Sequence, residues 1–302
     1  MSHEASVIQR VLVLGTGTMG QGIAQVTALA GYVTHMFDAE AGRISQAIES
    51  IKQSTDRLVQ KGKMLNEARS EMIGALVATP DLARACENVD LVIEAVPEQM
   101  ALKVEMFTQI KALAPAHAIL ASNTSSLSIT EIGKRVDAGA RTVGLHFFNP
   151  PPVMELLEVV RGLETGEEVL SICLAVAKRL GKTPIVVSDT PGFATSRLGV
   201  AIGAEAMRMV ETGVASVADI DRAMELGYRH PMGPLKLSDL VGLDVRLSIL
   251  EHLHREIGEQ FRPPVILRQL VRAGRLGKKS GQGFYRWTEK GPEPADVGRF
   301  AR

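Results

Sequence analysis

Short apolar runs recur through the first two-thirds of the chain, and stretches with helical periodicity separate them. The runs are rich in Val, Ile and Leu, which is typical of strands that are buried inside a sheet. Strands that alternate with helices indicate an open α/β sheet with mostly parallel pairing. We expect strands at residues 11–14, 33–37, 91–96, 118–121, 143–147, 156–160 and 185–187.

One stretch interrupts this alternation. From about residue 41 to residue 78 the pattern is helical and contains no strand signal, so we expect a helical arm that is longer than a usual crossover. The sequence QKGKM ends one helix of this arm with Lys61 and Lys63. Paired cations at a helix end can meet phosphate groups, although lysines on a charged helix also serve simply as solvated surface.

The character of the chain changes at Asp189-Thr190-Pro191-Gly192. Beyond this point we expect helices over residues 193–211, from a start at Ser216, and along a long segment over residues 235–257, with strand alternation only in the tail. A chain of 302 residues is also long for a single core. The sequence therefore predicts a Rossmann-type domain over residues 1–188 and a smaller all-α domain over residues 189–302.

A glycine-rich turn follows the first predicted strand. Gly15 permits the turn, Gly17 lets backbone amides approach a pyrophosphate, and Gly20 lets the next helix pack closely. The second predicted strand is followed by Asp38, whose carboxylate would accept from a ribose 2′-hydroxyl and repel a 2′-phosphate. We therefore expect a dinucleotide site that prefers NAD to NADP.

Polar side chains follow the next two predicted strands. Glu98 stands just beyond the strand in DLVIEAVPE, and Ser125 lies in a polar cluster directly after the strand at residues 118–121. Ligands of open α/β sheets bind outside the carboxyl ends of the strands, which makes both residues site candidates. The polar cluster has a second interpretation, because such residues also cap helices, and we expect a helix to begin near Ser128.

The stretch TVGLHFFNPPPVMELLE places a histidine and a glutamate on either side of three consecutive prolines. The prolines cannot continue a ladder, so we expect the chain to double back into a second strand. If the return is centred on Pro152, then His146 and Glu158 face each other. A carboxylate beside an imidazole stabilises its charged form and favours a general base, whereas a histidine beside an apolar run is also often a structural residue.

Composition narrows the possible partners. The 34 basic and 34 acidic residues cancel, so no nucleic-acid or membrane partner is implied, and no apolar run approaches the length of a membrane span. Cys86 and Cys173 are isolated from each other, which is typical of a reducing, cytoplasmic environment. His252 and His254 would diverge on a helix, and we expect no metal site.

Several motifs together resemble a known family. The chain is similar to the bacterial 3-hydroxybutyryl-CoA and L-3-hydroxyacyl-CoA dehydrogenases over nearly its whole length, in GTGTMGQGIAQ, VIEAVPE, ASNTSSLSIT, HFFNPPPVMELLEVVRG, DTPGF, HPMGPLKLSDLVGLD and GKKSGQGFY. This resemblance implies oxidation of an (S)-3-hydroxyacyl-CoA with NAD as cofactor. It also implies a homodimer formed through the helical domain.

The resemblance assigns roles on the substrate side. His146 resembles the family's catalytic base, Glu158 its carboxylate partner, and Ser125 the hydroxyl that binds substrate. The arm with Lys61 and Lys63 corresponds to the region that meets the CoA nucleotide.

On the cofactor side, Asn149 resembles the asparagine near the nicotinamide. Asp38, Glu98 and Lys103 match positions that hold the ribose groups and the cofactor edge. One position departs from the family pattern, because Ser196 stands where an asparagine is common after DTPGF, and this departure puts one substrate contact in doubt.

Three alternatives remain open at the level of sequence. The chain could be a related dehydrogenase of a hydroxy acid or sugar acid without CoA, an enzyme of a different nicotinamide-dependent class, or a non-catalytic NAD-binding protein. An intact histidine and glutamate argue against the last alternative, and the basic arm argues for CoA.

Overall fold

The structure, a computed structural model, describes residues 8–297. Its contacts divide the chain into two compact units, the first ending at Thr190 and the second beginning at Pro191. Separate apolar clusters fill the two units, so each has a core of its own.

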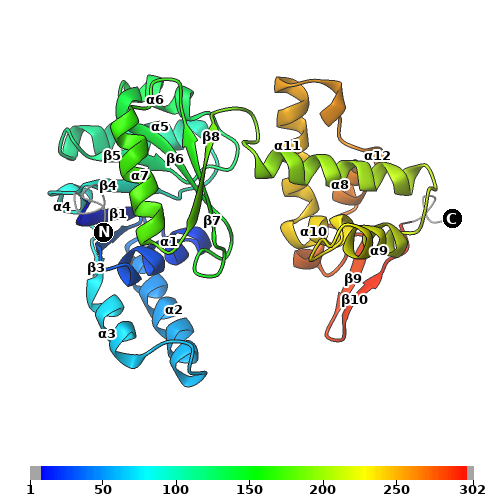
Figure 1. Ribbon diagram of the computed structural model, residues 1–302, viewed down its shortest axis with the longest axis horizontal. Helices are drawn as coiled ribbons and strands as arrows, with labels where there is room; N and C mark the ends of the chain where they lie inside the picture. The colour runs from blue at the N-terminus through cyan, green and yellow to red at the C-terminus, as the bar shows by residue number, and fades with distance from the viewer. Residues whose placement is uncertain (1–7, 298–302) are drawn as a thin grey trace. The chain divides into compact units, whose positions relative to one another are not determined.

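The first unit is built on an eight-stranded sheet with helices on both faces (Figure 1). The strand order is β3-β2-β1-β4-β5-β6-β7-β8, and every neighbouring pair is parallel except β6 and β7. This arrangement confirms the predicted α/β class. The strands are β1 (Arg10–Leu14), β2 (Val33–Phe37), β3 (Leu76–Ala78), β4 (Leu91–Glu94), β5 (Ile119–Ser122), β6 (Thr142–Phe147), β7 (Leu156–Arg161) and β8 (Thr183–Ser188).

Side chains of the strands alternate between two apolar layers. Val11 and Val13 of β1 lie in one layer, and Leu12 and Leu14 lie in the other. The first layer is covered by α1 (Thr18–Leu29), α2 (Ala41–Gln60), α3 (Asn66–Ala75) and α7 (Glu167–Arg179). The second is covered by α4 (Leu82–Cys86), α5 (Met100–Leu113) and α6 (Ile129–Val136).

The arm and the third predicted strand, at residues 91–96, differ in detail from the expectation. Helices α2 and α3 form the expected helical arm, but the prediction of no strand before residue 78 is wrong, because β3 pairs with residues 34–36 of β2. A strand of three residues at a sheet edge is too short to give a readable alternation. Strand β4 ends at Glu94 instead of continuing to Val96, because the Val96 amide donates to the Glu94 carboxylate at 2.7 Å.

The second unit is helical, with a short hairpin in the tail. The Ser216 hydroxyl accepts from the Asp219 amide at 3.2 Å, which confirms the expected helix start. The segment 235–257 is not one helix, because Gly242 has a φ of +108° and divides it. The elements are α8 (Thr195–Glu211), α9 (Val217–Gly227), α10 (Pro234–Val241), α11 (Leu243–Glu256), α12 (Val265–Arg272), β9 (Tyr285–Thr288) and β10 (Gly291–Pro294). No helix between residues 8 and 297 is long and apolar enough to cross a membrane.

Candidate active site

The glycine turn lies between β1 and α1. Gly15 has a φ of +85°, and a Cβ there would lie 2.9 Å from the carbonyl oxygen of Ala95. A Cβ on Gly20 would lie 1.8 Å from the carbonyl oxygen of Gly15, so only glycine lets α1 approach the turn. Gly17, in contrast, has open space beside it and lines a cavity of about 550 Å³. The turn has no room for a side chain at Gly15 or Gly20, whereas the space beside Gly17 is open. This open space suits the pyrophosphate of a dinucleotide.

Asp38 follows β2 and lines the same cavity. Its Oδ2 accepts from the amide and the hydroxyl of Thr16, both at 2.8 Å, and its Oδ1 accepts from the Glu40 amide at 3.1 Å. Burial acts to raise the pKa of Asp38, but these hydrogen bonds outweigh it and hold the pKa below its usual range. The carboxylate is therefore charged and fixed in place at neutral pH.

His146 and Glu158 lie opposite each other across the one antiparallel pair of the large sheet. The register of β6 and β7 pairs the two residues directly, and Nδ1 of His146 lies 2.7 Å from Oε2 of Glu158. Both are buried, Glu158 completely. The expected meeting of these two side chains is confirmed, because the pairing is centred on Pro152. The ring of Phe148 packs against the imidazole, with centroids 4.6 Å apart.

The proline turn between β6 and β7 is held from two sides. The buried ammonium group of Lys182 donates to the carbonyl oxygens of Pro151 and Met154, at 2.6 and 2.8 Å. On the other side Pro151 packs against α1, where a Cβ on Gly22 would lie only 2.6 Å from the proline ring. Gly22 is thus required by the proline turn that carries Asn149.

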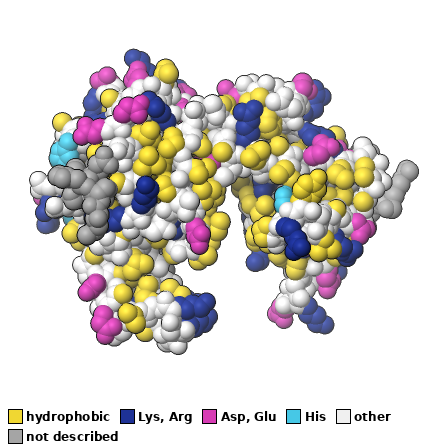
Figure 2. All heavy atoms as spheres, viewed as in Figure 1, with side chains coloured by type: hydrophobic (Ala, Val, Ile, Leu, Met, Phe, Trp, Pro, Cys, Tyr) yellow, Lys and Arg dark blue, Asp and Glu magenta, His cyan; other side chains and the backbone are white. Residues whose placement is uncertain are grey.

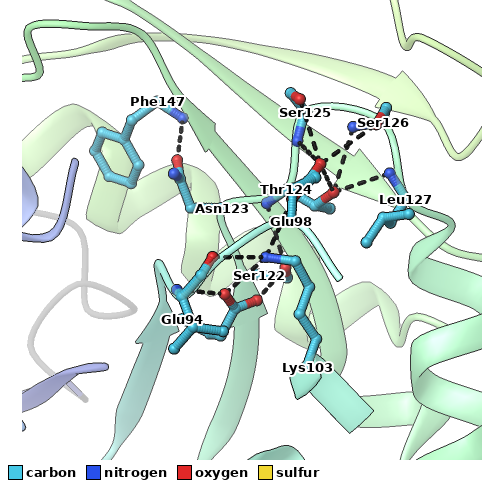
Figure 3. A network of polar contacts seen from close by, with 11 residues as sticks. Glu94, Glu98, Lys103, Ser122, Asn123, Thr124, Ser125, Ser126, Leu127 and Phe147 are labelled. Carbon is cyan, nitrogen blue, oxygen red and sulfur yellow. Dashed lines mark hydrogen bonds and ion pairs between the residues drawn. The ribbon is translucent and has the colours of Figure 1, made fainter. Parts of the chain in front are cut away.

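A buried ion-pair network lies at the carboxyl ends of β4 and β5 (Figure 3). The Lys103 ammonium lies 2.7 Å from Oε1 of Glu94 and 3.2 Å from Oε2 of Glu98, and it donates to the Val96 carbonyl oxygen at 3.4 Å. These acceptors use all three donors of a lysine. The Ser122 hydroxyl donates to the other Glu94 oxygen at 2.6 Å. Lys103 is 1% exposed and Glu94 is 0% exposed, so this lysine supports the site from beneath its surface.

The polar cluster after β5 is organised around Glu98. Its Oε1 accepts from the Thr124 hydroxyl at 2.6 Å and from the Ser125 amide at 2.9 Å, and the hydroxyls of Ser125 and Ser126 lie 3.3 Å away (Figure 3). Asn123 turns the other way and accepts from the Phe147 amide at 2.9 Å, next to His146 on β6. Hydrogen bonds thus connect the ends of β4, β5 and β6.

None of the contacts described above involves the remaining predicted residues. Asn149 is exposed in the proline turn, and Lys61 and Lys63 are exposed just beyond the end of α2. Figure 2 shows Lys and Arg side chains gathered at the tip of the arm. Ser196 is half-buried in the first turn of α8, in the second unit.

Sequence reasoning missed four residues that shape this site: Glu94, Asn123, Lys182 and Asp189. Asp189 accepts from the Ser128 hydroxyl at 2.7 Å and from the amides of Ile129 and Thr130, and so holds the start of α6. Glu94 offered a signal, because a carboxylate at the end of a buried strand needs a partner.

The glycine turn, the acidic residue after β2 and a buried histidine with its carboxylate define a nicotinamide-dependent oxidoreductase. Two family models match the chain. The 3-hydroxyacyl-CoA dehydrogenase NAD binding domain matches residues 10–190, and the 3-hydroxyacyl-CoA dehydrogenase C-terminal domain matches residues 192–287. The chain belongs to the 3-hydroxyacyl-CoA dehydrogenase family, and its cofactor is NAD.

Individual relatives resemble the chain over nearly its full length. The probable 3-hydroxybutyryl-CoA dehydrogenase of Bacillus subtilis is 45% identical over 94% of this chain and 99% of its own. The mitochondrial hydroxyacyl-coenzyme A dehydrogenase of Rattus norvegicus is 40% identical over 93% of this chain and 92% of its own. The crystal structure of (S)-3-hydroxybutyryl-CoA dehydrogenase from Ralstonia eutropha has a TM-score of 0.90 at 37% identity, covering 93% of this chain and 100% of that one.

Proposed function

We propose that this protein interconverts (S)-3-hydroxyacyl-CoA and 3-oxoacyl-CoA, with His146 as the base. The observation that carries the proposal is the buried contact between His146 and Glu158 within a family of this chemistry. Because Glu158 occupies Nδ1, the proton of the substrate hydroxyl passes to Nε2. Bound NAD supplies the acceptor for the hydride that leaves the same carbon. Glu158 stabilises the imidazolium that forms.

The polar ends of the neighbouring strands hold the reactants in this proposal. Ser125 orients the substrate oxygen, while Glu98 and Asp38 accept from ribose hydroxyls of the cofactor. Asn149 meets the nicotinamide from the proline turn. Lys103 keeps Glu98 charged and in place. Ser196 remains a predicted substrate contact through a bridging water, and Ser196→Ala should lower kcat/KM by roughly fivefold, the effect of one neutral hydrogen bond.

The CoA part of the substrate is supported by the basic arm and by the names of the relatives. Lys61 and Lys63 are exposed, so a phosphate group in solution can reach them. Charge-assisted contacts of this kind contribute about 1.5–3 kcal/mol. Replacing both lysines by alanine should raise the KM for acyl-CoA roughly tenfold or more and spare the KM for NAD. An unchanged KM for acyl-CoA would return both lysines to the role of solvated surface.

We also propose a homodimer formed through the second unit. Large apolar side chains are exposed there on several helices, among them Leu198, Leu226 and Val245, which are 64%, 72% and 41% exposed. A contiguous patch formed by such side chains would mark an interaction site. Sedimentation analysis should give twice the chain mass of 32.5 kDa. A single-chain mass at micromolar concentration would refute the dimer.

One assay tests the reaction itself. The oxidation of NADH is followed by absorbance with acetoacetyl-CoA, with longer 3-oxoacyl-CoA substrates and with free acetoacetate. We expect kcat/KM to be higher for the CoA esters, since free acetoacetate lacks the groups that would meet the arm. Equal kcat/KM for acetoacetate would instead favour a dehydrogenase of hydroxy acids without CoA.

A further inference from the structure

Glu98 contacts Ser125, the proposed substrate residue, and is itself a proposed cofactor residue. Several hydrogen-bond donors crowd one of its carboxylate oxygens. Four donors from three residues converge on Oε1. A carboxylate oxygen offers about two lone-pair positions, so four donors cannot all bond well. The Thr124 hydroxyl and the Ser125 amide, at 2.6 and 2.9 Å, hold the good positions. The hydroxyls of Ser125 and Ser126, both at 3.3 Å, make longer contacts that a ligand hydroxyl can replace.

The short and the long contacts have different effects: the short ones position the loop, and the long ones orient the serine hydroxyls. The short contacts from the Thr124 hydroxyl and the Ser125 amide hold the loop, and they do not involve the two serine hydroxyls. Ion pairing with Lys103 at 3.2 Å holds Glu98 from behind. The Glu98 side chain is nevertheless 38% exposed, so it can accept from a ligand on its open side.

Glu98 is charged at neutral pH. Burial acts to raise the pKa of Glu98, but Lys103 and the hydrogen bonds from Thr124 and Ser125 outweigh it and lower the pKa below its usual range. An ionised carboxylate only accepts hydrogen bonds. A ligand hydroxyl that reaches Oε1 of Glu98 would therefore compete with the serine hydroxyls for the same lone pairs.

We propose that Glu98 exchanges the Ser125 hydroxyl for a ribose hydroxyl of the cofactor, so that cofactor binding releases Ser125 to the substrate oxygen. The inference rests on the proposed function, in which Ser125 meets the substrate. Without cofactor, the Ser125 hydroxyl is held by Glu98. With cofactor bound, the same hydroxyl is available, and substrate binds more tightly. By linkage, substrate strengthens cofactor binding by the same factor.

Calorimetric titration with acetoacetyl-CoA measures this coupling directly. Each enzyme is titrated alone and with saturating NAD⁺, and because both compounds are oxidised, no turnover occurs. In the wild type, NAD⁺ should tighten binding of acetoacetyl-CoA. In Ser125→Ala the loss of affinity should be about three- to tenfold with NAD⁺, the effect of one neutral hydrogen bond, and less than about twofold without it.

Ser126→Ala is the matched control. Its hydroxyl makes the same 3.3 Å contact with Glu98 and is likewise a neighbour in the loop, but the proposal gives it no substrate contact. The affinity ratio with and without NAD⁺ should therefore equal that of the wild type. Both substitutions leave the Thr124 contact and the Ser125 amide in place, and thermal melting checks the fold. Ser125→Cys, which keeps the shape of the side chain but is slightly larger and a weaker donor, repeats the test.

The outcomes separate the two proposals. If Ser125→Ala weakens acetoacetyl-CoA binding equally with and without NAD⁺, then Ser125 contacts the substrate but the exchange at Glu98 is refuted. An equal change of the ratio in Ser126→Ala also refutes it. If Ser125→Ala weakens binding in neither state, then the role of Ser125 in the proposed function fails as well.

Discussion

In the proposed reaction, proton transfer at His146 depends on the carboxylate of Glu158, which is fully buried. We predict that His146→Gln lowers kcat by roughly 100- to 10,000-fold, the usual contribution of a positioned acid-base group. Glu158→Gln should act similarly, because a neutral amide cannot stabilise the imidazolium. Stopped-flow turnover, with NADH binding by fluorescence as the control for folding, measures both. Near wild-type turnover in either folded variant would remove the pair from the mechanism.

Asp38 should determine the choice of cofactor. Its carboxylate is charged, since hydrogen bonds from Thr16 and Glu40 lower its pKa against the effect of burial. A 2′-phosphate would therefore meet a fixed negative charge. We predict that kcat/KM for NAD exceeds that for NADP and that Asp38→Ser narrows the ratio. Equal kcat/KM for the two cofactors in the wild type would contradict this position for Asp38.

Single residues differ in how well the sequence predicts their contacts. The pairing of His146 with Glu158 could be predicted, because the two residues are equally far from Pro152 in the sequence and a return centred there brings them opposite each other. The contact of Asn123 with the Phe147 amide could not, because it depends on the order of β5 and β6 in the sheet. For the same reason Lys182 gave no signal, since its acceptors are backbone carbonyls on a distant turn.

At the scale of elements, α1 and the proline turn fit together through Gly22 and Pro151. We predict that Gly22→Ala displaces the turn and lowers kcat/KM at least tenfold, because the proline ring cannot yield by rotating a side chain. Pro151→Ala in the same chain removes the nearest ring atoms, so the double variant should lose less than the sum of the single effects. Kinetics of the three variants measure this. Additive losses would mean that the two residues act independently.

Elements with strong local patterns were predicted, and those fixed by neighbours were not. Strand β2 and the start of α6 at Ser128 follow from periodicity and capping. Strand β3 exists only because β2 offers an edge for pairing, and the break at Gly242 interrupts a pattern that is apolar on both sides. Pairing with β2 creates a strand where the local pattern is helical, and the positive φ of Gly242 ends a helix where the local pattern would continue it.

For the whole molecule, the two separate cores suggest independent folding of the first unit. The chain passes from one unit to the other once, between Thr190 and Pro191. We predict that a protein ending at Thr190 folds cooperatively and binds NADH, because the glycine turn and Asp38 lie entirely within it. It should have no measurable turnover, since the helical unit is missing. Thermal melting and NADH fluorescence test this, and loss of cooperative melting would show that the units depend on each other.

The hydrogen bonds from Lys182 to the proline turn also allow the opening of the turn to be followed by chemical labelling. Burial lowers the pKa of Lys182, so its neutral amine is more abundant than that of an ordinary lysine, yet the group is only 9% exposed. Because its nitrogen is held between two carbonyl oxygens of the turn, we expect acylating reagents to reach it mainly when the turn lifts away, so that the labelling rate reports how often the turn opens. Mass spectrometry of the labelled peptide should show slow modification that NADH slows further. Labelling as fast as that of the exposed Lys61 would mean that the turn opens freely.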